Sequence, residues 1–227
     1  AQKTNSKIVA FSNINLVVRP NKYSILEKIK FYVSNTLGLN FFGIYKSFGC
    51  AEIIFPNISD KNIEFAKDIF NKNYNLIKDE YDLMNFSIKG IKIGDLILDS
   101  YIKYFKNYDI DFGSKGFQNY FIDFISLYSY WETYFSTNKI NSLIVAHDFY
   151  AYGLITRISI KNNIDTYVQA SSRLLKIDKK NETSNVQFIH LKKIFSNFSE
   201  IEKIKCKKLA EKFLDYKFSG KTGVIIN

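Results

Sequence analysis

One stretch of the chain combines short apolar runs with helical spacing. Residues Ser142–Ala146 form an unbroken run, which is typical of a parallel strand buried on both faces. The polar pair His147-Asp148 ends this run, and apolar residues then recur on one side of a helix: Leu154, Ile155 and Ile158. Residues 165–169 follow the pair Asn162-Asn163 as the next strand. The pattern predicts a strand–helix–strand unit with parallel strands and a right-handed crossover.

The N-terminal part of the chain predicts two further strands and a helix between them. Residues 7–13 have the composition of a strand, and residues 52–55 form a short extended piece that stops at Pro56. Ser24 and Glu27 have the spacing of a capping box, so a helix begins there and continues toward Val33.

The middle of the chain predicts three more helices. Ser59 or Asp60 caps the first, whose inward side carries Ile63, Ala66, Ile69 and Phe70. Residues 90–94 read as a loop, and Asp95 has the position of an N-cap for the second helix. The third runs over residues 117–135 and has an aromatic stripe: Phe117, Tyr120, Phe121, Phe124, Tyr128 and Trp131. Helical spacing favours core packing of these rings over base stacking.

Two helices close the chain over residues 186–220, and a capping box of Ser199 and Glu202 opens the second. Neither an internal repeat nor a linker is evident. We therefore expect one α/β domain over residues 1–227, a Rossmann-like parallel sheet with additional helices.

The chain is basic, with a formal net charge of +10 at pH 7. Such an excess favours anionic partners, namely nucleic acid, a membrane surface or phosphorylated small molecules. The alternative is that heavy use of Lys, Asn and Ile reflects an A+T-rich bacterial genome. The lysines of residues 203–208 fit that alternative, because the apolar face of their helix leaves Lys205, Lys208 and Lys212 for solvent. Since aromatic stripes and lysines fall on separate helical faces, nucleic-acid binding is not expected.

The cysteine and hydropathy patterns favour a reducing compartment. Cys50 and Cys206 are too few for a secreted disulfide scaffold. Residues 8–11 are too short an apolar run for a signal peptide, and no run approaches the roughly 20 residues of a membrane helix. The expected location is the cytoplasm, with possible peripheral contact at the inner membrane.

Several catalytic and cofactor motifs are missing or incomplete. His147 and His190 lack cysteine partners at metal spacing, so we expect no metal site. Residues 219–223 resemble a phosphate-binding loop, but the first glycine of that motif is replaced by Asp215. Asp109-Ile-Asp111 matches the Asp-x-Asp site of one class of sugar transferases, and a surface turn explains it equally well. We expect no bound cofactor.

His147 and Asp148 are the strongest candidates for a functional site. They lie at the carboxyl end of a predicted parallel strand, where ligands bind in open α/β sheets. His147 could act as a general base, and Asp148 could orient its imidazole or accept a sugar hydroxyl. The alternative is structural, with Asp148 as the N-cap of the following helix and His147 as a turn residue.

Four segments, in order, resemble glycosyltransferases that build capsule, lipopolysaccharide and related bacterial surface glycans. His147–Arg157 resembles a segment in which a strand-end His leads into an aromatic, Gly-containing turn and an Arg-bearing helix. Gly90–Tyr101 resembles the Gly-x-x-x-Gly-Asp segment of the family, Ser171–Leu174 its next strand end, and Lys212–Gly220 the helix that ends the N-terminal half. The resemblance spans roughly residues 40 to 223.

The resemblance implies a two-domain transferase of the GT-B type. In this family the N-terminal half holds the acceptor and supplies the base, and the C-terminal half binds the nucleotide sugar without a metal. The chain corresponds to the acceptor-side half and stops where a donor-binding second domain would begin, so activity would need that domain. The expected reaction transfers a sugar from a nucleotide-sugar co-substrate to a growing surface glycan, free or lipid-linked.

The resemblance also assigns residues. His147 or Asp148 would serve as the base or an acceptor ligand. Acceptor contacts would come from four further residues: Gly94, Asp95, Tyr150 and Arg173. A helix cap is the alternative for Asp95, and a surface ion pair is the alternative for Arg173. A different function class also remains open, a non-catalytic glycan- or nucleotide-binding module of a polysaccharide-synthesis complex.

Overall fold

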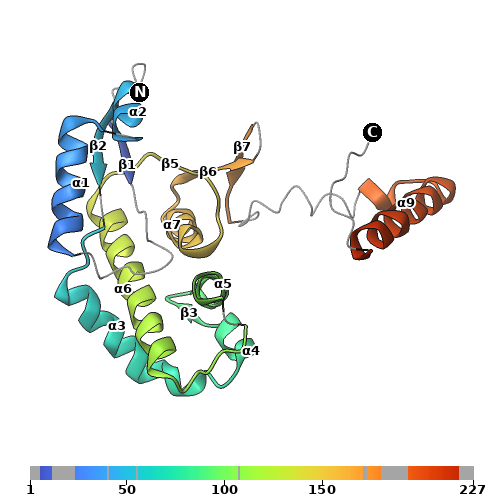
Figure 1. The fold of residues 1–227 in the computed structure, drawn as a ribbon, viewed down its shortest axis with the longest axis horizontal. Coiled ribbons are helices and arrows are strands. Elements are labelled where there is room, and N and C mark those ends of the chain that lie inside the picture. The colour runs from blue at the N-terminus through green and yellow to red at the C-terminus, as the bar shows by residue number, and fades with distance from the viewer. Residues whose placement is uncertain are drawn as a thin grey trace. The chain divides into compact units, whose positions relative to one another are not determined.

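The computed structural model describes residues 6–11, 24–39, 41–54, 56–106, 108–170, 173–179 and 194–219. The chain divides into two compact units, residues 1–182 and 183–227. The class is mixed α/β, and most of the described chain is helical (Figure 1).

The N-terminal part forms a parallel strand pair with two helices between the strands. Strand β1 (Ile8–Phe11) pairs with β2 (Cys50–Ile54). Helices α1 (Ile25–Leu37) and α2 (Phe41–Ser47) connect them. The predicted capping box is confirmed, since the Ser24 side chain accepts from the Glu27 amide and the Glu27 carboxylate accepts from Ser24. The predicted strand residues Ser12, Asn13 and Phe55 lie outside the described residues.

The middle of the chain is a helical assembly with one β-hairpin. Its helices are α3 (Asp60–Asn73), the 3₁₀ turn η1 (Tyr74–Leu76), α4 (Glu80–Met84), α5 (Gly94–Phe105) and α6 (Lys115–Thr137). The expected loop of residues 90–94 is instead shared between a hairpin and a helix. The hairpin pairs β3 (Ser87–Ile88) with β4 (Ile91–Lys92), and α5 already begins at Gly94. Lys89 and Gly90, both with positive φ, make the two-residue turn of the hairpin, the geometry that matches strand twist.

The strand–helix–strand unit is confirmed. Strand β5 (Ser142–Val145) runs parallel to β6 (Asp165–Ala170), and α7 (Tyr150–Lys161) connects them. Strand β7 (Arg173–Ile177) then pairs antiparallel with β6, so this sheet is mixed. A two-residue connection can form a hairpin but cannot cross over to a parallel position. A continuous parallel sheet is not seen among the described strands.

The prediction that the Ser142–Ala146 strand is buried on both faces is wrong. Val145 is buried, but the side chain of Ile144 is 60% exposed. Among the described strands β5 pairs with β6 alone, so it has an edge position in a small sheet. One face of β5 packs on the core and the other is open, which an apolar run by itself does not reveal.

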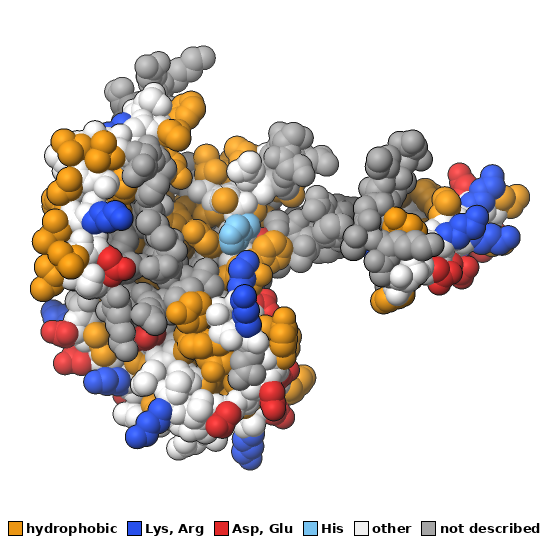
Figure 2. Space-filling view, viewed as in Figure 1, with side chains coloured by type: hydrophobic (Ala, Val, Ile, Leu, Met, Phe, Trp, Pro, Cys, Tyr) orange, Lys and Arg blue, Asp and Glu red, His pale blue; other side chains and the backbone are white. Residues whose placement is uncertain are grey.

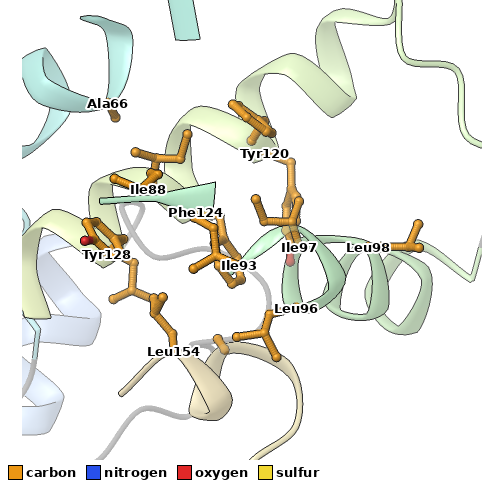
Figure 3. Packing of buried hydrophobic residues seen from close by; sticks show 14 of the residues in the cluster. Ala66, Ile88, Ile93, Leu96, Ile97, Leu98, Tyr120, Phe124, Tyr128 and Leu154 are labelled. Atoms are coloured by element: carbon orange, nitrogen blue, oxygen red, sulfur yellow. The ribbon is translucent and has the colours of Figure 1, made fainter. Parts of the chain in front are cut away.

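The core lies around α6, whose aromatic stripe is buried as predicted. Phe117, Phe121 and Tyr128 are fully buried, and Trp131 nearly so. Figure 3 shows the apolar side chains of α5 and α7 and of the β3–β4 hairpin converging on this helix. Each buried side chain of this size contributes about 1.5–3 kcal/mol. This packing fixes α5 and α7 as neighbours.

The second unit is described through α9 (Glu200–Phe218), whose predicted capping box of Ser199 and Glu202 is confirmed. None of the side chains of α9 is buried, although an apolar face was predicted. The predicted helix residues 186–193 lie outside the described residues, as do His190 and the predicted loop residues 220–223. No helix in the described part of the chain is long and apolar enough to cross a membrane.

Candidate functional site

The turn between β5 and α7 places His147 beyond the carboxyl end of β5. Helix α7 begins at Tyr150 and has Phe149 as its N-cap residue, so the alternative in which Asp148 caps this helix is wrong. The Asp148 residue is instead buried, with 6% of its surface exposed. A Cβ on Gly153 would lie 2.4 Å from the backbone carbonyl oxygen of Asp148, so only glycine allows α7 to lie this close to the turn.

The backbone at the start of α7 is strained. Tyr150 has φ +54°, a left-handed conformation that is unusual for a bulky residue and costs about 1–3 kcal/mol. The ring of Tyr150 receives the ammonium of Lys103, whose Nζ lies 4.3 Å from the ring centroid. This cation–π contact joins the turn to α5 and offsets part of the strain.

His147 is half-buried among aromatic rings. Its imidazole meets the Tyr152 ring edge-on at a centroid distance of 4.6 Å and has Phe149 and Tyr150 at 6.2 Å. Its Nδ1 atom is buried and has no hydrogen-bond partner. Buried polar atoms are nearly always paired, so an unpaired one in a turn beyond a strand end is a candidate ligand contact.

A cleft of about 720 Å³ lies between the exposed side of α5 and the start of α7. Seven residues line it: Asp99, Ile102, Lys103, Lys106, Tyr108, Phe149 and Tyr150. Aromatic rings, two ammonium groups and one carboxylate therefore share one cavity. His147 is not among the lining residues, but it is two residues from Phe149 and contacts the same rings.

Asp99 has a perturbed acidity. Asp99 is exposed at the cleft, but partial desolvation by its neighbours raises the pKa of its carboxyl. The neighbouring Asp95 carboxylate raises this pKa further, while Arg157 opposes both effects. A cleft carboxylate with a raised pKa is a better proton acceptor than an ordinary surface aspartate. Asp99 is therefore a candidate acid–base group.

Asp95 does not cap α5 with its side chain, and the prediction that it is the N-cap is wrong. The N-cap residue is Ile93, and Asp95 lies in the first turn of the helix. Its two carboxylate oxygens accept from the two terminal nitrogens of Arg157, both at 2.6 Å. Arg157 also donates to the Lys92 carbonyl at 2.6 Å, so it joins the hairpin, α5 and α7. The pair fixes the two walls of the cleft relative to each other.

Gly94, Arg173 and Asp111 are the other candidate residues from the sequence, and they lie in different parts of the fold. Gly94 has a packing role, since a Cβ there would lie 1.5 Å from the Leu83 carbonyl oxygen. Arg173 begins β7, and its side chain lies outside the described residues. Asp111 accepts from the Gly113 amide at 2.9 Å, as in the surface-turn interpretation. No group of three or more metal-type side chains occurs within the described ranges.

Sequence reasoning missed Asp99, Lys103 and Lys106 and gave no role to Arg157. Asp95, Asp99 and Lys103 are spaced four residues apart, so they lie along one face of α5. That spacing was visible in the sequence. The partner of Asp95 was not visible in the sequence, because Arg157 is 62 residues away along the chain.

No protein-family model, curated protein or solved structure matches this chain.

Proposed function

We propose that this chain is the acceptor-side domain of a GT-B-type glycosyltransferase, and that the cleft between α5 and α7 holds a bacterial surface glycan. The observation that carries the proposal is the composition of this cleft, which has three aromatic rings, two lysines and an aspartate beyond the end of a parallel strand.

The lining chemistry suits a charged glycan. The apolar faces of sugar rings stack on aromatic side chains, and Tyr108, Phe149 and Tyr150 supply such rings. Lys103 and Lys106 add positive charge, which favours glycans with carboxylate or phosphate groups. A cleft of this size accommodates a few sugar residues, within the range of about 300–1,000 Å³ for small-ligand sites.

The arrangement of strands supports a Rossmann-like domain. Both β1–β2 and β5–β6 are parallel pairs with helices in their connections. Phe11, the last residue of β1, packs against the buried cluster of β5, β6 and β7 that includes Val145 and Val168. We infer that the two pairs are halves of one divided sheet. In such sheets ligands bind beyond the carboxyl ends of the strands, where His147 lies.

Transfer would proceed by deprotonation of an acceptor hydroxyl. The oxygen then attacks the anomeric carbon of the donor sugar, a new C–O bond forms, and the nucleoside diphosphate leaves with the electrons of the broken bond. Asp99 in the cleft and His147 beside it are the candidate proton acceptors, and the raised pKa of Asp99 suits this role. The donor nucleotide sugar would bind to a second domain.

Calorimetric titration with short acidic glycans tests the proposal. Lys103→Gln combined with Lys106→Gln should weaken binding about tenfold or more, because each lysine contributes a charge-assisted contact. The matched control is Lys61→Gln combined with Lys67→Gln, two exposed lysines of α3 whose loss removes the same charge. Equal weakening by both pairs would indicate non-specific attraction and would contradict a site in the cleft.

A transfer assay then separates catalysis from simple binding. With the donor-binding domain supplied, Asp99→Asn or His147→Gln should lower the transfer rate while glycan affinity stays within about threefold. Affinity without transfer in any longer version of the chain would support the binding-module alternative.

A further inference from the structure

Helix α1 presents its apolar side outward. Ile25, Ile29 and Val33 recur at helical spacing with Leu26, Tyr32 and Leu37 beside them, and all six side chains are exposed. Ile25 and Leu26 are each 77% exposed. The side chains that face the protein body are instead Phe31, which packs edge-on against Phe42, and Asn35, whose amide donates to the Ile53 carbonyl. The usual orientation of an amphipathic surface helix is therefore reversed.

The patch continues onto α2. Ile44 on α2 and Phe48 directly after it are also exposed, and Figure 2 shows hydrophobic side chains gathered over α1. Monomeric soluble proteins seldom leave a contiguous apolar surface of this kind open to water. Among the described residues no element covers it.

The charges beside the patch are basic. Lys28 and Lys30 flank the apolar stripe on α1, and the ammonium of Lys46 on α2 bonds to the Asn35 carbonyl at the end of α1. The one acidic side chain of α1, Glu27, accepts from Ser24 in the capping box and keeps its charge, so the three lysines exceed it by two charges (3 − 1 = 2). The surroundings of the stripe are therefore positive, in a chain of net charge +10.

We propose that the outward face of α1, with α2, binds the surface of an anionic lipid bilayer. The helix would lie in the plane of the interface, with its apolar side chains among the acyl chains and Lys28 and Lys30 at the level of the headgroups. Apolar burial and attraction to anionic lipid act together in such helices. Tyr32 has the amphipathic ring that is favoured at this boundary. This inference does not depend on the cleft.

Vesicle flotation tests the proposal with the complete chain. The chain should float with vesicles of phosphatidylcholine and phosphatidylglycerol and bind more weakly to phosphatidylcholine alone or at high salt. Leu26→Glu should reduce binding to the anionic vesicles about tenfold or more, because one large apolar contact is lost and a repelled charge is added. The matched control is Leu76→Glu on η1, where a leucine that is 69% exposed receives the same charge.

Two further measurements keep the test independent of how Leu26→Glu folds. Lys28→Glu combined with Lys30→Glu should lower anionic-vesicle binding about tenfold or more, whereas Lys61→Glu with Lys67→Glu should change it much less. In the unaltered chain, vesicles should slow hydrogen exchange of amides 25–37 and leave those of α3 unchanged.

Three results would overturn the proposal. The first is an unaltered chain that remains unbound to anionic vesicles. The second is equal loss of binding in Leu26→Glu and Leu76→Glu. The third is a dimer that Leu26→Glu dissociates, since a second copy would then cover α1. Vesicle binding without glycan binding would refute the proposed glycosyltransferase function and leave the membrane proposal standing.

Discussion

The ion pair of Asp95 and Arg157 gives the sharpest stability prediction. Both carboxylate oxygens bond to the guanidinium at 2.6 Å, and the side chains of Arg157 and Asp95 are only 18% and 26% exposed. Exposed pairs contribute about 0–1 kcal/mol, while removal of one partner of a fully buried pair costs about 3–5 kcal/mol. This pair lies between those limits, so Arg157→Met should destabilise the protein by about 2 kcal/mol.

A double-mutant cycle isolates the interaction of the two side chains. Arg157→Met, Asp95→Asn and the double variant should give a coupling free energy of about 1–2 kcal/mol. Thermal unfolding can resolve this, since about 2 kcal/mol corresponds to roughly 4–8 °C for a unit of this size. The coupling should persist at high salt because partly buried charges are weakly screened.

The pair of Asp68 and Lys72 on α3 is the matched control. Its atoms are 2.8 Å apart, but both side chains are more than half exposed. The same cycle with Asp68→Asn and Lys72→Met should give a coupling below about 0.5 kcal/mol. A coupling at Asp95 and Arg157 that is no larger than this, or one that vanishes with salt, would refute the claim that the pair fixes the walls of the cleft.

Four further substitutions have directions set by the structure, and thermal unfolding measures each. Gly94→Ala should destabilise by about 3 kcal/mol or more and Gly153→Ala by about 1–3 kcal/mol, because each new Cβ would overlap a backbone carbonyl. Gly116→Ala on the exposed side of α6 should instead stabilise by about 0.5–1 kcal/mol. A stability change of the same sign at all three glycines would contradict the close carbonyl contacts at Gly94 and Gly153. Asp99→Asn should stabilise slightly at neutral pH, by less than about 0.5 kcal/mol. Because the pKa of Asp99 is raised in the folded state, the protonated carboxyl stabilises the fold relative to the ionised one. This stability is fully present below the ordinary carboxyl pKa and is lost as pH rises through the folded-state pKa. The higher stability of Asp99→Asn should therefore disappear in acid. A lower stability of Asp99→Asn at neutral pH would contradict this sign.

Local features of the fold were predictable because their signals lie within a few residues. The capping boxes at Ser24 and Ser199 each need a Glu three residues on, and both form. The aromatic stripe of α6 repeats at helical spacing, so its burial follows from periodicity. The unit of β5, α7 and β6 was predictable from the lengths and order of its apolar runs.

Features that depend on distant contacts were not predictable. Asp95 has the residue type and position of an N-cap, and only the approach of α7 makes it the partner of Arg157. The exposure of Ile144 depends on which strands flank β5. The cleft needs α5 beside the start of α7, so Asp99 gains its surroundings from a tertiary arrangement. The sequence placed His147 and Tyr150 in the right turn, but not the residues that face them.

The proposed function requires that this chain binds a glycan in the cleft. The most direct measurement is a thermal-shift panel on the 227-residue chain with acidic glycans, nucleotide sugars and oligonucleotides at two salt concentrations. We expect stabilisation by an acidic glycan that Lys103→Gln with Lys106→Gln removes, and no stabilisation by nucleotide sugars. Stabilisation by a nucleotide sugar would mean that the chain is the donor side. A shift with oligonucleotides alone that is lost at high salt would contradict the glycosyltransferase proposal.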